Sequence, residues 1–423
     1  MVKHSNKKIF GVFLALSLLF LAVSISVVSA VEVTKEGTIV SSRGWMISEA
    51  TPFGIYYGFG SQGPGYDYNP PVLSDIYYFD FATKTNTVVK SQDSQPDIGL
   101  PDVSKPTIWS ATYSAIVGDN IFISSVYYDY PIYKDDIFKG DVNGIYAIDT
   151  KTNTFYLYDR TPFNFFENNL PSPMTAVGNS LYFFVESERR VYSYDTTTKK
   201  STALAELPAD VGFGAIVHSI GSNIYITTYK YGEENSLYVY DTLADKFTYL
   251  ATDKLIPTNL NSGKAVIDDK LYFVGGEDPI TYEALNNTVE YDTKTNTFSV
   301  VKQLDDGYLG ASATSVGGTI YLVGGEVHSV PHLTDNITAI KIAPKDLATT
   351  IAEYLCNYYP ANVCAEHFLT SKNYSNRGDY ISYVAQKTNE FVSNSLITGK
   401  EKSEIMTNAA ELSKSLPVGK KNR

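Results

Sequence analysis

The chain has 423 residues, a formal net charge of −12 and a pI near 5.0. A hydrophobic fraction of 43% with 19% charged residues supports a large buried core and excludes an intrinsically disordered chain. The acidic balance argues against a nucleic-acid-binding groove, because such a groove needs clustered Lys and Arg to neutralise phosphates.

The first 30 residues have the pattern of an export signal. A lysine-containing start precedes an uncharged apolar stretch over residues 9–28, and the small residues Ser29 and Ala30 offer a cleavage site. We predict a signal peptide over residues 1–30 and a mature chain that begins at Val31. The alternative is an uncleaved membrane anchor, since the apolar stretch approaches the roughly 20 residues of a spanning helix. Both alternatives place the rest of the chain outside the cytoplasm, secreted or at the cell surface.

A short phrase recurs along the next 300 residues and marks a repeat. Its acidic residue follows an aromatic or aliphatic residue at Asp149, Asp195, Asp241 and Asp292, in steps of 46, 46 and 51 residues. This period is typical of the blades of a β-propeller. In each phrase an alternating strand runs into a turn rich in Asp, Thr and Asn, so the phrase predicts a β-hairpin.

A second hairpin precedes each phrase. Its turn contains Gly, Asn or Asp and is followed by an apolar, β-rich strand. Two hairpins in each period make a four-stranded blade, and blades packed around an axis leave only short, protected strand edges. We count six blades, over residues 40–90, 108–160, 172–205, 212–252, 262–303 and 309–342.

The sixth repeat lacks a return strand after Lys341, because Pro344 ends its third strand. We therefore predict that the missing outer strand comes from residues 31–40. Strands from both ends of the chain would then form one blade and close the ring. A five-bladed ring with a separate N-terminal sheet is the alternative.

Two glycine pairs and an aromatic position connect the repeats to a known family. The pairs Gly275-Gly276 and Gly324-Gly325 lie at the ends of the second strands of two repeats, and Phe298 lies seven residues after Tyr291 of the Tyr291-Asp292 pair. These residues resemble the kelch repeat, in which the glycines permit close strand packing and a Trp usually stands where this chain has Phe298. The double glycine occurs in only two blades. The resemblance extends over most of residues 38–342 and implies an all-β, six-bladed kelch-like β-propeller over residues 31–343.

The pattern changes to helical after Pro344, and we predict a small C-terminal helical domain over residues 344–423. Its helices are expected around residues 347–356, 365–369, 378–397 and 401–416. The chain has two cysteines, Cys356 and Cys364, which flank a turn in this domain. An exported chain reaches an oxidising compartment, so they are predicted to form a disulfide.

Histidines are scarce and predict no metal site and no cofactor. His328 and His332 lie on a loop that contains Pro331, so they lack the helical geometry that would let both bind one ion. His218 lies in an inner-strand segment and is expected to be buried or in the channel. Galactose oxidases carry their chemistry on a kelch propeller with a Cys coupled to a Tyr. This chain has no Cys in residues 31–343, which excludes that chemistry.

The exported sialic-acid mutarotases are a second kelch-like group, and their acid–base chemistry requires carboxylates near an Arg. Glu186, Glu188, Arg189 and Arg190 share one loop. No catalytic motif of that group matches this chain residue by residue, so no catalytic residue is assigned. A carbohydrate-active enzyme similar to a sugar mutarotase is the alternative to a binding protein.

An acidic residue recurs just after the second strand in four blades. If these side chains point inward they form an acidic ring at the channel mouth, suited to a cation or a polyhydroxyl ligand. The alternative is that they are solvated loop residues. The four members of this acidic ring are Glu186, Glu233, Glu277 and Glu326.

Three Asn-x-Ser/Thr sequons, at Asn286, Asn336 and Asn373, are glycosylation candidates.

Residues 128–143 interrupt the period of the repeat and are rich in Tyr and Asp. They are either a ligand-binding loop or a neutral insertion. We predict a secreted or cell-surface binding module for a protein or carbohydrate ligand. No nucleic-acid partner is expected. If the chain is attached to a membrane, the attachment is expected only through an uncleaved signal anchor.

Overall fold

A computed structural model describes residues 31–44, 46–60, 75–90, 106–108, 113–124, 127–129, 144–160, 166–167, 170–211, 215–228, 232–327, 332–343, 356, 364–365, 368, 374, 376–393 and 397–416. The predicted signal peptide, His328 and Asn373 lie outside the described residues. So do the predicted helix before Cys356 and most of the long insertion that follows residue 129.

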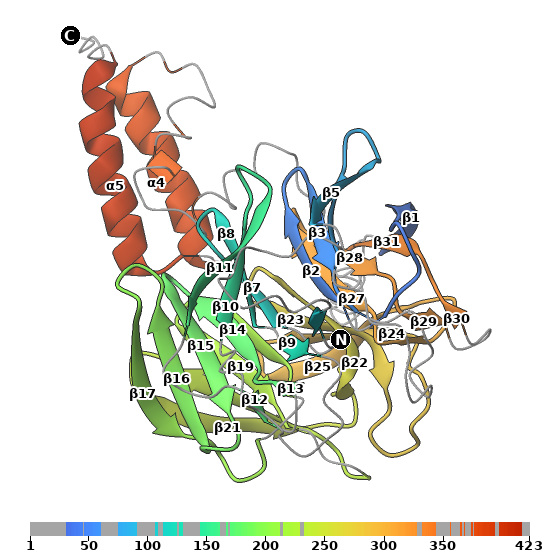
Figure 1. Ribbon diagram of the computed structural model, residues 1–423. Coiled ribbons are helices and arrows are strands. Elements are labelled where there is room, and N and C mark those ends of the chain that lie inside the picture. The colour runs from blue at the N-terminus through green and yellow to red at the C-terminus, as the bar shows by residue number, and fades with distance from the viewer. Residues whose placement is uncertain are drawn as a thin grey trace, which may run out of the picture.

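Six four-stranded antiparallel sheets form the body of the protein and confirm the six-bladed propeller (Figure 1). Blade 1 contains β2 (Ile47–Thr51), β3 (Gly54–Gly58), β4 (Ile76–Asp80) and β5 (Asn86–Lys90). Blade 2 contains β7 (Tyr113–Val117), β8 (Asn120–Ser124), β10 (Gly144–Asp149) and β11 (Thr154–Arg160). Blade 3 contains β14 (Met174–Val177), β15 (Ser180–Val185), β16 (Arg190–Asp195) and β17 (Lys200–Glu206).

Blade 4 contains β18 (Val217–Ile220), β19 (Asn223–Thr227), β20 (Ser236–Asp241) and β21 (Lys246–Thr252). Blade 5 contains β22 (Thr258–Ile267), β23 (Lys270–Glu277), β24 (Asn287–Asp292) and β25 (Thr297–Gln303). Blade 6 contains β27 (Ser312–Val316), β28 (Thr319–Val323), β31 (Asn336–Lys341) and β1 (Glu32–Thr38). Short accessory sheets pair β6 (Pro106–Ile108) with β9 (Tyr127–Asp129), β12 (Phe166–Glu167) with β13 (Leu170–Pro171), and β29 (Glu326–Val327) with β26 (Tyr308–Leu309) and β30 (His332–Leu333).

A repeated Asp builds the outer hairpin turn in five of the blades. Asp149 accepts hydrogen bonds at one carboxylate oxygen from the backbone N–H groups of Lys151 and Thr152, at 2.8 and 3.0 Å. The next residue, Asn153, has φ of 55°, a left-handed conformation that Asn tolerates well. Equivalent pairs of bonds form at Asp80, Asp195, Asp241 and Asp292. The turn chemistry read from the sequence is therefore confirmed in five blades.

Both ends of the propeller chain meet in blade 6. Strand β1 pairs antiparallel with β31, from Glu32 opposite Lys341 to Thr38 opposite Asn336. The innermost strands β2, β7, β14, β18, β22 and β27 each contact their neighbours in that order, and β27 contacts β2. The ring is therefore closed, and the predicted strand from the N-terminus is confirmed in place of the five-bladed alternative.

The second glycine pair allows the chain to approach itself closely where the ring closes. Gly324 has φ of 61° and Gly325 has φ of 96°, which side-chain-bearing residues rarely adopt. A Cβ atom on Gly324 would lie 2.4 Å from the carbonyl oxygen of Arg43. Gly275 and Gly276 of blade 5 have the same pair of conformations, at 62° and 96°. Both double glycines are therefore required by backbone geometry.

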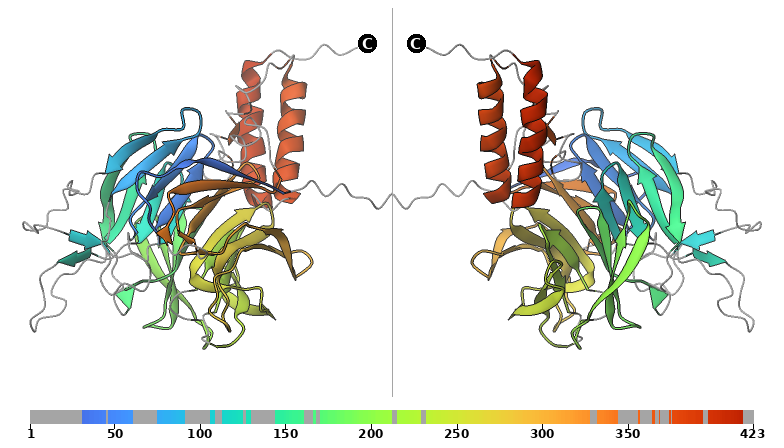
Figure 2. Two further views of the ribbon diagram at one scale, coloured as in Figure 1. Left: turned by 90° about the vertical axis from the view of Figure 1, so that its right-hand side faces the viewer. Right: turned by 90° about the vertical axis from the view of Figure 1, so that its left-hand side faces the viewer.

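The C-terminal unit has a hydrophobic core of its own. Helices α4 (Arg377–Ser393) and α5 (Gly399–Leu412) pack side by side and project from the propeller, followed by the short 3₁₀ helix η1 (Ser413–Ser415) (Figure 2). Their core includes Phe368, Tyr380, Val384, Phe391 and Ile405. Both helices begin slightly earlier and end earlier than predicted. No helix within the described ranges is long and apolar enough to cross a membrane.

The predicted disulfide between Cys356 and Cys364 is confirmed, and both cysteines lie in this helical core. Replacing both with Ser is expected to destabilise the helical unit by about 2–3 kcal/mol, because the unfolded chain regains the entropy of a short loop. Helical circular dichroism during thermal unfolding measures the change. Reduction of the wild-type chain is a matched control, since the chain has no other cysteines. An unchanged helical transition would contradict the stabilising role.

Candidate functional site

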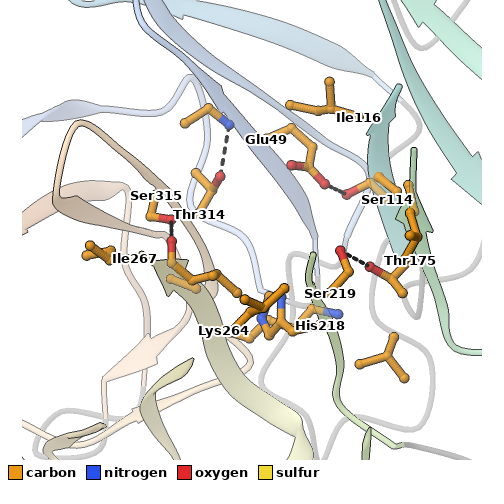
Figure 3. A pocket seen from close by; sticks show the side chains of 18 of the residues that line it. Glu49, Ser114, Ile116, Thr175, His218, Ser219, Lys264, Ile267, Thr314 and Ser315 are labelled. Atoms are coloured by element: carbon orange, nitrogen blue, oxygen red, sulfur yellow. Dashed lines mark hydrogen bonds between the residues drawn. The ribbon is translucent and has the colours of Figure 1, made fainter. Parts of the chain in front are cut away.

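A cavity of about 550 Å³ occupies the central channel (Figure 3). All six innermost strands line it, and Thr398, Lys400 and Glu401 line it from the start of α5. Its volume lies within the range of about 300–1,000 Å³ that small-molecule sites occupy. The channel cavity is therefore the candidate functional site.

Polar side chains enter the cavity at matching positions of the innermost strands. Each innermost strand ends at a hairpin turn. Two residues before the last residue of the strand, four blades have a polar side chain: Glu49, Thr175, His218 and Thr314. Three residues before the last residue, three blades have one: Ser48, Ser114 and Lys264. Polar groups at two adjoining levels of the channel therefore share its wall with apolar side chains.

Glu49 of β2 is a carboxyl group held in the cavity wall. Ser114 of β7 donates a hydrogen bond from its hydroxyl to Glu49 Oε1 at 2.8 Å. Burial raises the pKa of Glu49 to about 7, although the Ser114 hydrogen bond and the charge of Lys264 act in the opposite direction. Protonated and ionised forms of this carboxyl group are therefore both populated near neutral pH.

Lys264 of β22 presents an amine to the same cavity. Burial lowers the pKa of Lys264 to about 8, and the charge of Glu49 limits the fall. Its Nζ lies 4.8 Å from the centre of the Tyr113 ring, a cation–π contact. Within the described residues no hydrogen bond or ion pair holds Nζ, and none joins it to Glu49. Glu49 and Lys264 therefore interact through space across the cavity.

His218 of β18 lines the same cavity as Glu49 and Lys264. Burial lowers the pKa of His218 to about 3, and the positive charge of Lys264 lowers it further, so the imidazole is neutral at physiological pH. Its Nε2 is buried and has no hydrogen-bond partner in the part of the chain that is described. The prediction that His218 is a buried or channel histidine is confirmed.

Hydroxyl groups tie neighbouring blades together around the cavity. The Ser48 and Ser312 hydroxyls of β2 and β27 lie 2.7 Å apart, and the Thr175 hydroxyl lies 3.5 Å from that of Ser219. Thr314 of β27 accepts a hydrogen bond from the backbone N–H of Ala50 at 2.9 Å. These bonds between blades fix the positions of the cavity-lining side chains before any ligand arrives.

The helical unit borders one mouth of the cavity through a capped helix start. Thr398 caps α5: its hydroxyl accepts from the Glu401 backbone N–H at 3.2 Å, and its own N–H donates to Glu401 Oε2 at 2.6 Å. Glu401 is therefore used in the cap. Lys400, between them, adds a second cation at this mouth.

The four members of the acidic ring lie in different surroundings, and none of them lines the channel cavity. Glu233 is exposed, Glu186 and Glu277 are half-buried, and Glu326 is 5% exposed at the start of β29. Their joint binding of a ligand stays a prediction.

Asn286, Asn336 and His332 do not line the channel cavity either. Asn286 is exposed and donates a hydrogen bond from its side chain to the Leu304 carbonyl at 3.2 Å, while Asn336 starts β31. Their glycosylation stays a prediction. His332 lies in β30. Across the described ranges no group of three or more His, Cys, Asp and Glu residues is placed to hold a metal ion.

Sequence reasoning found His218 but missed Glu49 and Lys264. The available signal was a charged residue inside an innermost strand, in ISEAT for Glu49 and in SGKAVI for Lys264. Such a residue usually faces solvent on an amphipathic strand. On the innermost strand of a propeller it faces the channel instead.

No protein-family model matches the sequence, and no curated protein matches it. A solved structure titled "Structure of YjhT" is similar to this chain, with a TM-score of 0.49 and 12% sequence identity. The aligned region covers 71% of this chain and 95% of that chain.

Proposed function

We propose that this protein is an exported, kelch-type propeller that binds a small carbohydrate in its central channel. The observation that carries the proposal is the pair formed by Glu49 and Lys264, which face one cavity without a direct ion pair between them. A sugar hydroxyl is both a donor and an acceptor, so one ligand satisfies the carboxyl group, the amine and the hydroxyls around them. Apolar side chains such as Ile116 and Val217 also line the cavity and can contact the carbon skeleton of a sugar.

Two further features support the finer parts of the proposal. The double glycines, with their matching left-handed conformations, support the kelch assignment. The disulfide of the helical unit supports an oxidising destination outside the cytoplasm. A protein ligand is the other class expected from the sequence, and it would use the loops on the propeller faces.

Substituting Glu49→Gln or Lys264→Met is expected to weaken carbohydrate binding at least about tenfold, because each removes a charge-assisted hydrogen bond worth about 1.5–3 kcal/mol. A glycan array first identifies the ligand, and isothermal calorimetry then measures its affinity for each variant. Glu206→Gln and Lys246→Met, on exposed outer strands, are matched controls that should bind as the wild type does. Equal affinity in all four variants would place the ligand outside the channel.

Acid–base catalysis on a sugar is a second candidate function. The observation that favours it is a carboxyl group with a pKa of about 7 facing an amine with a pKa of about 8, both suited to proton transfer near neutral pH. A mutarotase-like site is expected to bring carboxylates and an Arg together, and the described lining residues bring a Lys instead. Anomer exchange of reducing sugars, followed by NMR, tests this. A rate that Glu49→Gln does not change would reject it.

A further inference from the structure

The amine of Lys264 lies at the wall of the channel cavity, and nothing in the described residues neutralises it directly. The Lys264 side chain as a whole is half-buried. Arg43 and Lys270, by contrast, form ion pairs with Asp75 and Glu290. Lys264 contacts the face of the Tyr113 ring, and no hydrogen bond or ion pair within the described residues holds its Nζ. Its nitrogen is therefore positioned for a group that arrives from the cavity.

The groups around this nitrogen suit reaction with a carbonyl carbon. Lys264 has an uncharged fraction near neutral pH, because burial holds the pKa of its amine at about 8. A neutral amine is a nucleophile, whereas an ammonium ion is not. Glu49 faces the same cavity from β2 and is partly protonated near neutral pH, so it can donate a proton to an oxygen. His218 is neutral and adds no competing charge.

We propose that Lys264 forms a reversible imine with the aldehyde of a small hydroxyaldehyde, such as the open-chain form of a reducing sugar. Nζ attacks the carbonyl carbon, and a carbon–nitrogen bond forms. The nitrogen gives up two protons, the carbonyl oxygen receives two and leaves as water, and the carbon–nitrogen double bond remains. Glu49 relays the proton to the departing oxygen. Amine and aldehyde give imine and water, so the step needs no oxidant or reductant. This inference rests on the proposed function, because it concerns the same cavity.

Reductive trapping on the full chain tests the imine. The protein is incubated with glycolaldehyde and sodium cyanoborohydride, and peptide mapping by mass spectrometry measures the rate at which each lysine gains a hydroxyethyl group. Lys264 is expected to react at least about tenfold faster than Lys246, which is exposed on β21, because burial holds the pKa of the Lys264 amine at about 8 and the cavity brings the aldehyde to it. This comparison is internal to the wild-type protein and needs no variant that could misfold. Labelling of Lys264 no faster than of Lys246 would overturn the imine.

Glu49→Gln tests the proton donor, with Glu206→Gln on the exposed outer strand as the matched control. Slower labelling of Lys264 in Glu49→Gln alone is expected. Faster labelling would overturn the donor role, because loss of the Glu49 charge by itself leaves more of the amine uncharged. A reducing sugar that binds and leaves Lys264 unmodified would overturn the imine and keep the proposed function. Fast labelling of Lys264 with no glycan bound would overturn the proposed function alone.

Discussion

Replacing Arg43 with Ala is expected to lower the free energy of unfolding by about 3–5 kcal/mol, because it leaves a buried carboxylate without its partner. Arg43 lies in the segment that connects β1 to β2, its side chain is completely buried, and its Nη1 lies 2.9 Å from Asp75 Oδ1. The same nitrogen donates to the Phe59 carbonyl at 3.2 Å, and the guanidinium lies 5.6 Å from the centre of the Tyr77 ring. Urea unfolding measures the difference.

The ion pair of Arg43 and Asp75 also predicts how the stability of the protein depends on pH. Burial alone would raise the pKa of Asp75, but the hydrogen bonds and charge of Arg43 hold it below the ordinary value of 3.8. A carboxyl group whose pKa is lower in the folded state stabilises the fold above its unfolded pKa. This contribution is therefore present above pH 3.8 and is lost as the pH falls through the lower, folded pKa.

An exposed ion pair is the control for Arg43. Lys84 pairs with Glu36 on the surface, with the Lys84 side chain 47% exposed. Lys84→Ala is expected to cost no more than about 1 kcal/mol, because solvent screens an exposed pair and ordering two long side chains offsets the gain. Equal effects for Arg43→Ala and Lys84→Ala would contradict the role of burial.

The six blades could be predicted from the sequence because the information is local. Asp149 and its equivalents fix a turn through hydrogen bonds to backbone groups two and three residues away, so the hairpin depends on a short run of consecutive residues. The strand count of the sixth blade is incomplete without the N-terminal segment, which identifies that segment as its outer strand. The start of α5 is also readable, since Thr398 and Glu401 have capping-box spacing. The predicted start at residue 401 is too late because Gly399 is a poor helix former.

The channel site could not be predicted because it exists only when the ring is closed. Glu49 and Lys264 lie 215 residues apart and belong to blades 1 and 5. Their shifted pKa values come from burial and from each other, and both causes depend on how six blades pack. The acidic ring rests on a correct rule, that equivalent positions share a face. That rule does not give the direction of side chains in irregular loops, and Glu326 is buried.

Removing residues 31–38 is expected to destabilise the propeller at least as much as the loss of Arg43 does. Six residues of β1 pair with β31, and each strand hydrogen bond contributes about 0.5–1.5 kcal/mol, so the loss is about 5 kcal/mol. A loss of this size is a large fraction of the total stability of a typical domain. The deletion also exposes the edge of β31, a template for association between chains. Thermal unfolding and light scattering of the truncated chain measure both effects.

Adding the missing strand back distinguishes ring closure from a general effect of truncation. A synthetic peptide of residues 31–40 is expected to bind the open edge of β31 and raise the melting temperature of the truncated chain, since an extended peptide adds readily to an exposed sheet edge. The same peptide with Pro in place of Val33 and Lys35 is the control, because Pro removes backbone donors from the ladder. Both positions pair with β31, opposite Ile340 and Thr338. A truncated chain as stable as the full one, or rescue by the proline peptide, would show that the ring closes without β1.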